Sequence, residues 1–203
     1  MAASGEIIYE RPNLLDSTHD GVELINSNRF AFLMMLGMDV MLFVGLGGGY
    51  MVLRGGSLSW PPPGAPSLRP AVMVWSCVFI VLASVVFAVG LKNHKKGNAR
   101  QARLALFAGS LLILGFLITN AFEWSYLITN GMDIMTVFGG IYYTLMGTFL
   151  IHVVIGSIFL FWIISRTMRT GNSGKSVNSV THVAYFFYVL TLLWLSIYGL
   201  VYS

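Results

Sequence analysis

The sequence predicts an all-α fold, a polytopic membrane bundle of five transmembrane helices, on two observations. Of the 203 residues, 56% are hydrophobic and only 10% are charged, whereas about a quarter of the residues in soluble proteins are charged; the mean hydropathy is +0.76. In addition, five apolar stretches reach the roughly 20 residues that a helix needs to cross the hydrocarbon core of a bilayer. These stretches are Phe30–Val52, Ala71–Leu91, Leu104–Ile128, Met135–Ile164 and Val183–Tyr202.

The residues ahead of the first span form a segment of different composition. Residues 1–28 contain five acidic residues and one basic residue, Arg11. They show neither the basic start nor the early apolar run of a cleavable signal peptide. The sequence therefore divides into an N-terminal segment, 1–28, and a five-helix membrane domain, 29–203.

The basic residues predict the orientation of the spans. Eight of the twelve lysines and arginines lie in the connections between the second and third spans and between the fourth and fifth. The positive-inside rule places both connections in the cytoplasm. The N-terminus is then cytoplasmic, the C-terminus lies outside, and only Arg54 and Arg69 face outward. Because topology accounts for the basic residues, we expect no nucleic-acid partner.

Two of the connections have a distinctive composition. Arg54–Pro70 is rich in proline and glycine and should be an extended strap, since proline removes a backbone donor and fixes φ. Its Trp60 is expected at the level of the lipid headgroups, where amphipathic aromatic side chains gather. Thr167–Val180 is rich in glycine, serine and asparagine, which predicts a flexible inner loop.

Asp39 lies in the middle of the first span, about 15 Å from its inner start at 1.5 Å per residue. A carboxylate at this depth costs about 2.5–3.5 kcal/mol even on insertion scales, so it should have a partner or a function. By the same rise, His152 of the fourth span lies roughly 18 Å from the inner edge, at a comparable height. Two interpretations stay open. Asp39 exchanges protons, or it is a neutral or hydrogen-bonded acid that fixes helix packing.

Glu123 is predicted at the outer interface, because it lies about 28 Å above the start of the third span. Thr119 and Asn120, one turn earlier, should join it in an outer polar cluster. For Glu123 a structural role is favoured over a catalytic one.

Small and polar residues predict where helices pack closely. Thr144, Thr148, His152 and Gly156 recur every four residues and share one face of the fourth span. Gly45 and Gly49 form a similar face on the first span. Such faces allow membrane helices to approach closely, where lipid supplies no hydrophobic drive between them.

The residues do not predict a cofactor site. A haem with two histidine ligands needs them on facing helices, but His19 and His94 are expected outside the membrane and His182 at the inner end of the fifth span, so only His152 is deep. The single cysteine, Cys77, cannot build a thiolate metal site. Met34, Met38 and Met41 share a face of the first span. Packing against a neighbour is favoured there over Cu(I) binding.

Several segments resemble the cytochrome c oxidase subunit III family. They are MDVMLFVGL at Met38–Leu46, WPPPGAPSLRP at Trp60–Pro70, NAFEW at Asn120–Trp124, HVVIGSIFL at His152–Leu160 and WLSIYGLVY at Trp194–Tyr202. The resemblance covers most of Asn28–Ser203 and is similar in helix order to the short five-helix bacterial form. The chain departs from the family pattern at four positions. Asp39 stands where glutamate is usual, Phe149 where a histidine is expected, and Tyr188 and Thr191 replace a histidine and an aspartate.

The resemblance implies an accessory subunit, without redox centres, of a respiratory terminal oxidase in the bacterial cytoplasmic (inner) membrane. Such a subunit packs against subunit I, which carries haem and copper, together with subunit II. It supports assembly and proton uptake, and it binds phospholipid in a cleft. Asp39 would be the buried carboxylate near that cleft, His152 its partner, and Glu123 a cleft or outer-interface residue.

Two alternatives remain. The chain could serve a nitric oxide reductase or another membrane redox complex in the same accessory role. It could also be a stand-alone proton channel or transporter, although five helices without visible inverted repeats do not favour this function.

Overall fold

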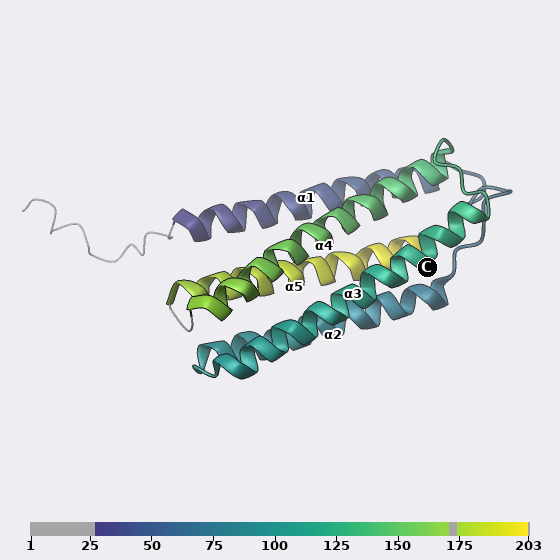
Figure 1. Ribbon diagram of the computed structural model, residues 1–203. Helices are drawn as coiled ribbons and strands as arrows, with labels where there is room; N and C mark the ends of the chain where they lie inside the picture. Colours follow the sequence, from purple (N-terminus) through teal and green to yellow (C-terminus); the bar gives the residue numbers. More distant parts are fainter. Residues whose placement is uncertain (1–26, 171–173, 203) are drawn as a thin grey trace, which may run out of the picture.

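The computed structural model describes residues 27–170 and 174–202, which form five α-helices (Figure 1). They are α1 (Ser27–Gly55), α2 (Pro70–Lys95), α3 (Ala99–Thr129), α4 (Val137–Thr170) and α5 (Gly174–Tyr202). All five are long and apolar enough to cross a membrane, which confirms the predicted all-α fold with five candidate spans. The N-terminal segment predicted at 1–28 lies outside the described residues, except for its last two, which begin α1.

The helices extend beyond the predicted spans, and the correction is largest between α4 and α5. The predicted flexible loop Thr167–Val180 is helical through Thr170 and again from Gly174. Hydropathy marks where the hydrocarbon core ends, but backbone hydrogen bonding continues into the polar interface. At its other end, α4 begins at Val137, two residues after the predicted start of the span at Met135. Thr136 caps the helix there, because its hydroxyl accepts a hydrogen bond from the Gly139 amide at 3.0 Å.

The helices run lengthwise between two ends of the bundle (Figure 1). The start of α1, the α2–α3 turn and the start of α5 lie at one end. The segments 56–69 and 130–136 lie at the other, together with the end of α5. This arrangement agrees with the predicted alternation of loops. Which end faces the cytoplasm stays a prediction from the loop charges.

Helix α1 is the least covered element. It packs against α4 and α5, whereas α2 and α3 pack against each other along most of their length. Within its most apolar stretch, 11% of the residues of α1 are buried, against 28% to 44% in the other four helices. Most of the surface of α1 is therefore left for lipid or for another protein.

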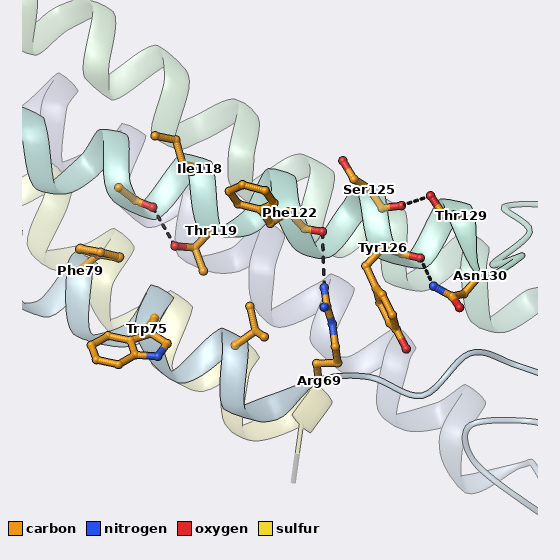
Figure 2. A pocket seen from close by; sticks show the side chains of 12 residues that line it. Arg69, Trp75, Phe79, Ile118, Thr119, Phe122, Ser125, Tyr126, Thr129 and Asn130 are labelled. Atoms are coloured by element: carbon orange, nitrogen blue, oxygen red, sulfur yellow. Dashed lines mark hydrogen bonds between the residues drawn. The ribbon is translucent and has the colours of Figure 1, made fainter.

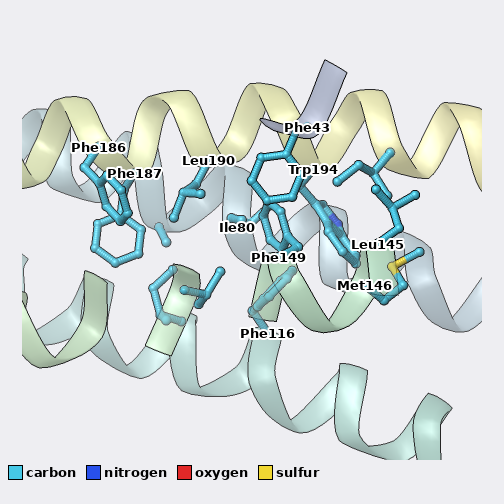
Figure 3. Close-up of a cluster of buried hydrophobic side chains, with 14 of the residues drawn as sticks. Phe43, Ile80, Phe116, Leu145, Met146, Phe149, Phe186, Phe187, Leu190 and Trp194 are labelled. Atoms are coloured by element: carbon cyan, nitrogen blue, oxygen red, sulfur yellow. The ribbon is translucent and has the colours of Figure 1, made fainter. Parts of the chain in front are cut away.

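Aromatic side chains from four helices meet in the centre of the bundle (Figure 3). The Trp194 ring centroid lies 4.9 Å from that of Phe116 and 4.9 Å from that of Phe149, and Phe43 packs against Phe149 at 5.7 Å. Offset and edge-to-face ring pairs of this kind contribute about 0.5–1.5 kcal/mol each beyond their buried area. Phe149, which stands where the family has a histidine, is therefore part of this apolar centre.

The proline-rich connection 56–69 is non-helical, as predicted. Trp60 is half-buried in it, and its indole Nε1 donates a hydrogen bond to the Tyr50 hydroxyl at 2.8 Å. Its ring also packs edge-on against Phe138 of α4 at 5.1 Å. The connection is thereby held against α1 and α4.

Only part of the predicted small-residue packing occurs within the chain. A β-carbon at Gly156 would lie 2.6 Å from Phe186 and 3.2 Å from Phe187, so glycine allows the close approach of α4 and α5. A β-carbon at Gly45 or Gly49 would meet no atom within 4 Å. The prediction that these two glycines bring helices of this chain together is thus not met, because the face that carries them has no neighbour here.

Thr144 likewise does not face the protein. It is exposed, and its hydroxyl donates to the Gly140 carbonyl of its own helix at 2.7 Å. A repeat of four residues drifts around a helix of 3.6 residues per turn, so Thr144 and Gly156, three turns apart, point in different directions. The inward face begins at Thr148, which is half-buried.

We expect Gly156→Ala to destabilise the bundle by about 1–3 kcal/mol, because the added methyl group overpacks the contact with Phe186 and Phe187. Gly45→Ala is the matched control. It should be neutral or stabilising by up to about 1 kcal/mol, since alanine is the better helix former. Unfolding of the purified chain in mixed detergent micelles, followed by circular dichroism, measures both. Equal effects of the two substitutions would contradict the packing described here.

Candidate functional site

A polar contact midway along α1 joins α1 to α4. Asp39 Oδ1 lies 3.3 Å from His152 Nε2, and His152 Nδ1 lies 2.7 Å from the Thr148 carbonyl oxygen. The side chains of Asp39 and His152 are 15% and 19% exposed. The structure therefore brings together the two residues that the depth estimates place at similar heights. The proton-exchanging role proposed for them stays a prediction.

The Thr148 carbonyl determines how this pair holds protons. A carbonyl only accepts hydrogen bonds, so Nδ1 of His152 carries the hydrogen at that contact. Nε2 then faces Asp39 Oδ1 across 3.3 Å. One proton between these two atoms, on either of them, would give the pair zero net charge and leave no unpaired charge in the apolar interior.

One side of the pair is closed by an aromatic ring. Phe43, one turn after Asp39 on α1, packs edge-on against the His152 ring with centroids 5.3 Å apart. Phe43 is itself buried. The pair thus lies against the aromatic centre of the bundle and keeps its remaining exposure at the boundary between α1 and α4.

A second polar contact joins the start of α2 to α3, toward the end of the bundle where the connection 56–69 lies. Glu123 is fully buried, and its Oε2 accepts from Nε of Arg69 at 3.0 Å and lies 2.9 Å from Nη2. Its Oε1 accepts from the backbone amide of Arg69 at 3.2 Å. The Arg69 guanidinium also lies 3.6 Å above the Tyr126 ring, a cation–π contact. The charge of Glu123 is therefore compensated within the chain.

Arg69 is the partner that sequence reasoning missed. Hydropathy assigned it to a connection, away from Glu123. Two signals point to the pairing: Arg69 directly precedes Pro70, the first residue of α2, and Glu123 was predicted at the same membrane interface. Thr119 and Asn120, which were predicted to cluster with Glu123, form hydrogen bonds with other partners. Asn120 donates to the Ser76 hydroxyl at 2.9 Å, whereas Thr119 donates to a carbonyl of its own helix.

A groove of about 900 Å³ runs along α2 and α3, in the half of these helices nearest the connection 56–69 (Figure 2). Four aromatic side chains line part of it, Trp75, Phe79, Phe122 and Tyr126, and Arg69 also lines it. Glu123 does not line the groove, because Arg69 and Tyr126 cover it. The expectation that Glu123 lines a cleft is thus not met by this groove.

The remaining candidate ligands are dispersed. Among the described residues, no three His, Cys, Asp or Glu side chains lie close enough together to hold a metal ion. His94 is buried within the protein near the end of α2, and His182 packs against Phe32. Met34, Met38 and Met41 are 54%, 63% and 79% exposed on α1, so most of their surface is not covered by this chain.

Comparisons with known proteins identify the family. The family model of cytochrome c oxidase subunit III matches residues 16–203. The chain is 24% identical over 171 residues to the probable cytochrome c oxidase subunit 3 of Mycobacterium leprae (strain TN), covering 82% of this chain and 83% of that protein. It is 26% identical over 186 residues to cytochrome c oxidase subunit 3 of Bacillus subtilis (strain 168), covering 89% and 88%. The Rattus norvegicus subunit 3 is 28% identical over 148 residues, 70% of this chain and 54% of that protein.

We expect Arg69→Gln to destabilise the chain by about 3 kcal/mol, because it leaves the buried carboxylate of Glu123 without its cationic partner. Arg69→Gln/Glu123→Gln removes both charges and should recover most of the loss. Unfolding in mixed micelles measures the single and double variants as a double-mutant cycle. A double variant no more stable than Arg69→Gln would show that the pair does not act as a unit.

Proposed function

Because the chain belongs to the cytochrome c oxidase subunit III family, we propose that it is an accessory subunit of a respiratory haem-copper oxidase and carries no redox centre of its own. The match over residues 16–203, which includes all five helices, carries this proposal. Its partners are subunit I, which holds the haem and copper, and subunit II. The complex lies in a bacterial cytoplasmic membrane.

The uncovered face of α1 is the proposed surface for subunit I. Met34, Met38 and Met41 are exposed along it, and Gly45 and Gly49 continue the row toward the outer end. Methionine adapts to irregular partner surfaces, and a pair of glycines four residues apart lets a partner helix approach closely. The glycine face that is empty within this chain would then pack against a helix of the partner.

The Asp39–His152 pair is proposed to support proton uptake by subunit I. With one proton between its two side chains the pair would have zero net charge, and both side chains retain some exposure. Asp39 directly follows Met38 of the proposed interface. A proton held by the pair therefore lies beside the surface that the catalytic subunit would cover. Phospholipid is proposed to cover the apolar surface that no subunit contacts, including the groove between α2 and α3.

Isolation of the intact complex tests the assembly. An affinity tag on this chain should recover a large subunit with the absorption spectrum of haem, together with copper. Met41→Trp should reduce the recovered haem, because the larger ring blocks a protein interface, whereas Leu111→Trp on the exposed face of α3 should not. Recovery of a stable chain without haem would reject the accessory function. The haem spectrum also separates an oxidase from a nitric oxide reductase.

Substitutions of Asp39 separate proton exchange from packing. Asp39→Asn keeps a polar partner for His152 but cannot exchange a proton, so it should leave assembly intact and slow proton-coupled turnover. Asp39→Leu also leaves His152 Nε2 without a partner, which should weaken the chain by about 1–3 kcal/mol and lower its yield in the complex. Oxygen consumption and subunit stoichiometry measure the two effects. Unchanged turnover and yield in both variants would exclude both roles.

A further inference from the structure

Basic side chains gather at the turn between α2 and α3, and acidic side chains gather in the sequence ahead of α1. The basic turn, as we call it, comprises Lys92, Lys95, Lys96, Arg100 and Arg103, and all of these except Arg103 are exposed. Five of the eight acidic residues of the chain lie in the segment 1–26: Glu6, Glu10, Asp16, Asp20 and Glu23. The same segment holds one arginine, Arg11, and no lysine. We infer that the segment 1–26 binds the basic turn through its acidic side chains.

The charge of the basic turn is uncompensated by the described part of the chain. Its three lysines follow each other at positions i, i+3 and i+4, a spacing at which like charges on a helix repel. The acidic residues of the described ranges are Asp39, Glu123 and Asp133. The first two pair with His152 and Arg69, and Asp133 lies in the connection 130–136, at the opposite end of the bundle (Figure 1). Any acidic counterpart of the basic turn within this chain therefore lies outside the described ranges.

The acidic segment is long enough to reach the basic turn. The start of α1 and the basic turn lie at the same end of the bundle (Figure 1), with α5 packed against both α1 and α2. Because packed helices lie about 8–10 Å apart, the basic turn is roughly 16–20 Å from Ser27 across that end. An extended chain covers about 3.3 Å per residue, so the distance from Ser27 is at most about 23 Å to Asp20, about 36 Å to Asp16 and only about 13 Å to Glu23. Asp16 and Asp20 can therefore meet the lysines, whereas Glu23 cannot.

The covalent connection to α1 makes weak ion pairs sufficient. An exposed ion pair by itself contributes little to the free energy of association. A segment joined to the same chain by a short linker is present at an effective concentration on the order of 1 mM, however, and it brings several carboxylates to the basic turn together. Binding these carboxylates would also relieve the repulsion between the lysines.

The basic turn suits the segment better than the second basic connection of the chain. It has five basic residues within positions 92–103, whereas the connection between α4 and α5 has three within positions 166–175. Bound to the basic turn, the segment would link the start of α1 to the end of α2, two helices that do not pack against each other in the described part of the chain. The inference uses neither the Asp39–His152 pair nor the face of α1 proposed for subunit I. It therefore stands or falls independently of the proposed function.

Photo-cross-linking in native membranes tests the inference. Benzoylphenylalanine replaces Thr18, which lies between Asp16 and Asp20 in the sequence, the membranes are irradiated, and mass spectrometry identifies the cross-linked peptide. The expected peptide contains residues 92–103. Lys95→Gln/Lys96→Gln should lower its yield about fivefold, since each exposed ion pair contributes roughly a twofold preference. Arg166→Gln/Arg169→Gln removes the same charge from the other basic connection and should change the yield less than about twofold.

A charge exchange separates direct pairing from general surface charge. Asp16→Lys/Asp20→Lys should abolish the cross-link, and addition of Lys95→Glu/Lys96→Glu should restore it, because the opposite charges then meet again. Glu23→Gln should leave the yield unchanged, since this residue is too near α1 to reach the lysines. Failure of the exchange to restore the cross-link would overturn the inference, as would equal losses in the lysine and arginine variants. Cross-links chiefly to positions 166–175, to another subunit or to lipid would also overturn it, because the segment would then lie elsewhere.

Discussion

Lipid offers polar side chains no hydrogen-bond partner, so a polar side chain inside the bundle gains from a partner on a neighbouring helix. Three such pairs connect the helices of this chain. Asp39 joins α1 to α4 through His152, and Arg69 joins the start of α2 to α3 through Glu123. Deeper in the bundle, the Ser84 and Thr191 hydroxyls meet at 2.6 Å between α2 and α5. Because lipid is as apolar as leucine, burial of apolar side chains does not drive membrane helices together. Polar contacts between helices help to hold them together instead.

Close packing of apolar side chains also holds the helices together. The aromatic centre around Trp194 fills the space between four helices, and Gly109 lets the ring of Phe87 lie directly on the backbone of α3. Helix α1 takes the smallest part in this packing, and its outward face combines exposed methionines with unoccupied glycines. The chain is thus well packed around α2, α3 and α5 and largely uncovered along α1, the helix proposed above to contact subunit I.

The sequence predicts the five helices well, because length and hydropathy suffice to recognise a membrane span. The depth of Asp39 and His152 also follows from the rise per residue, since both lie on continuous helices. The Arg69–Glu123 pair could not be derived in this way, because Arg69 lies in a connection whose path depends on tertiary contacts. Periodicity shows that Gly45 and Gly49 share a face, but it does not say which neighbour, in this chain or another, fills that face. Hydropathy also does not predict the polar ends of α4 and α5, where each helix continues beyond the apolar span.

The hydrogen bond between His152 and the Thr148 carbonyl determines which ring nitrogen faces α1. A backbone carbonyl only accepts hydrogen bonds, so Nδ1 keeps its hydrogen at that contact and the imidazole meets Asp39 through Nε2 alone. Thr148 lies one turn before His152 on α4. The backbone of α4 therefore orients the imidazole, and a contact within one helix sets the geometry of a contact between two.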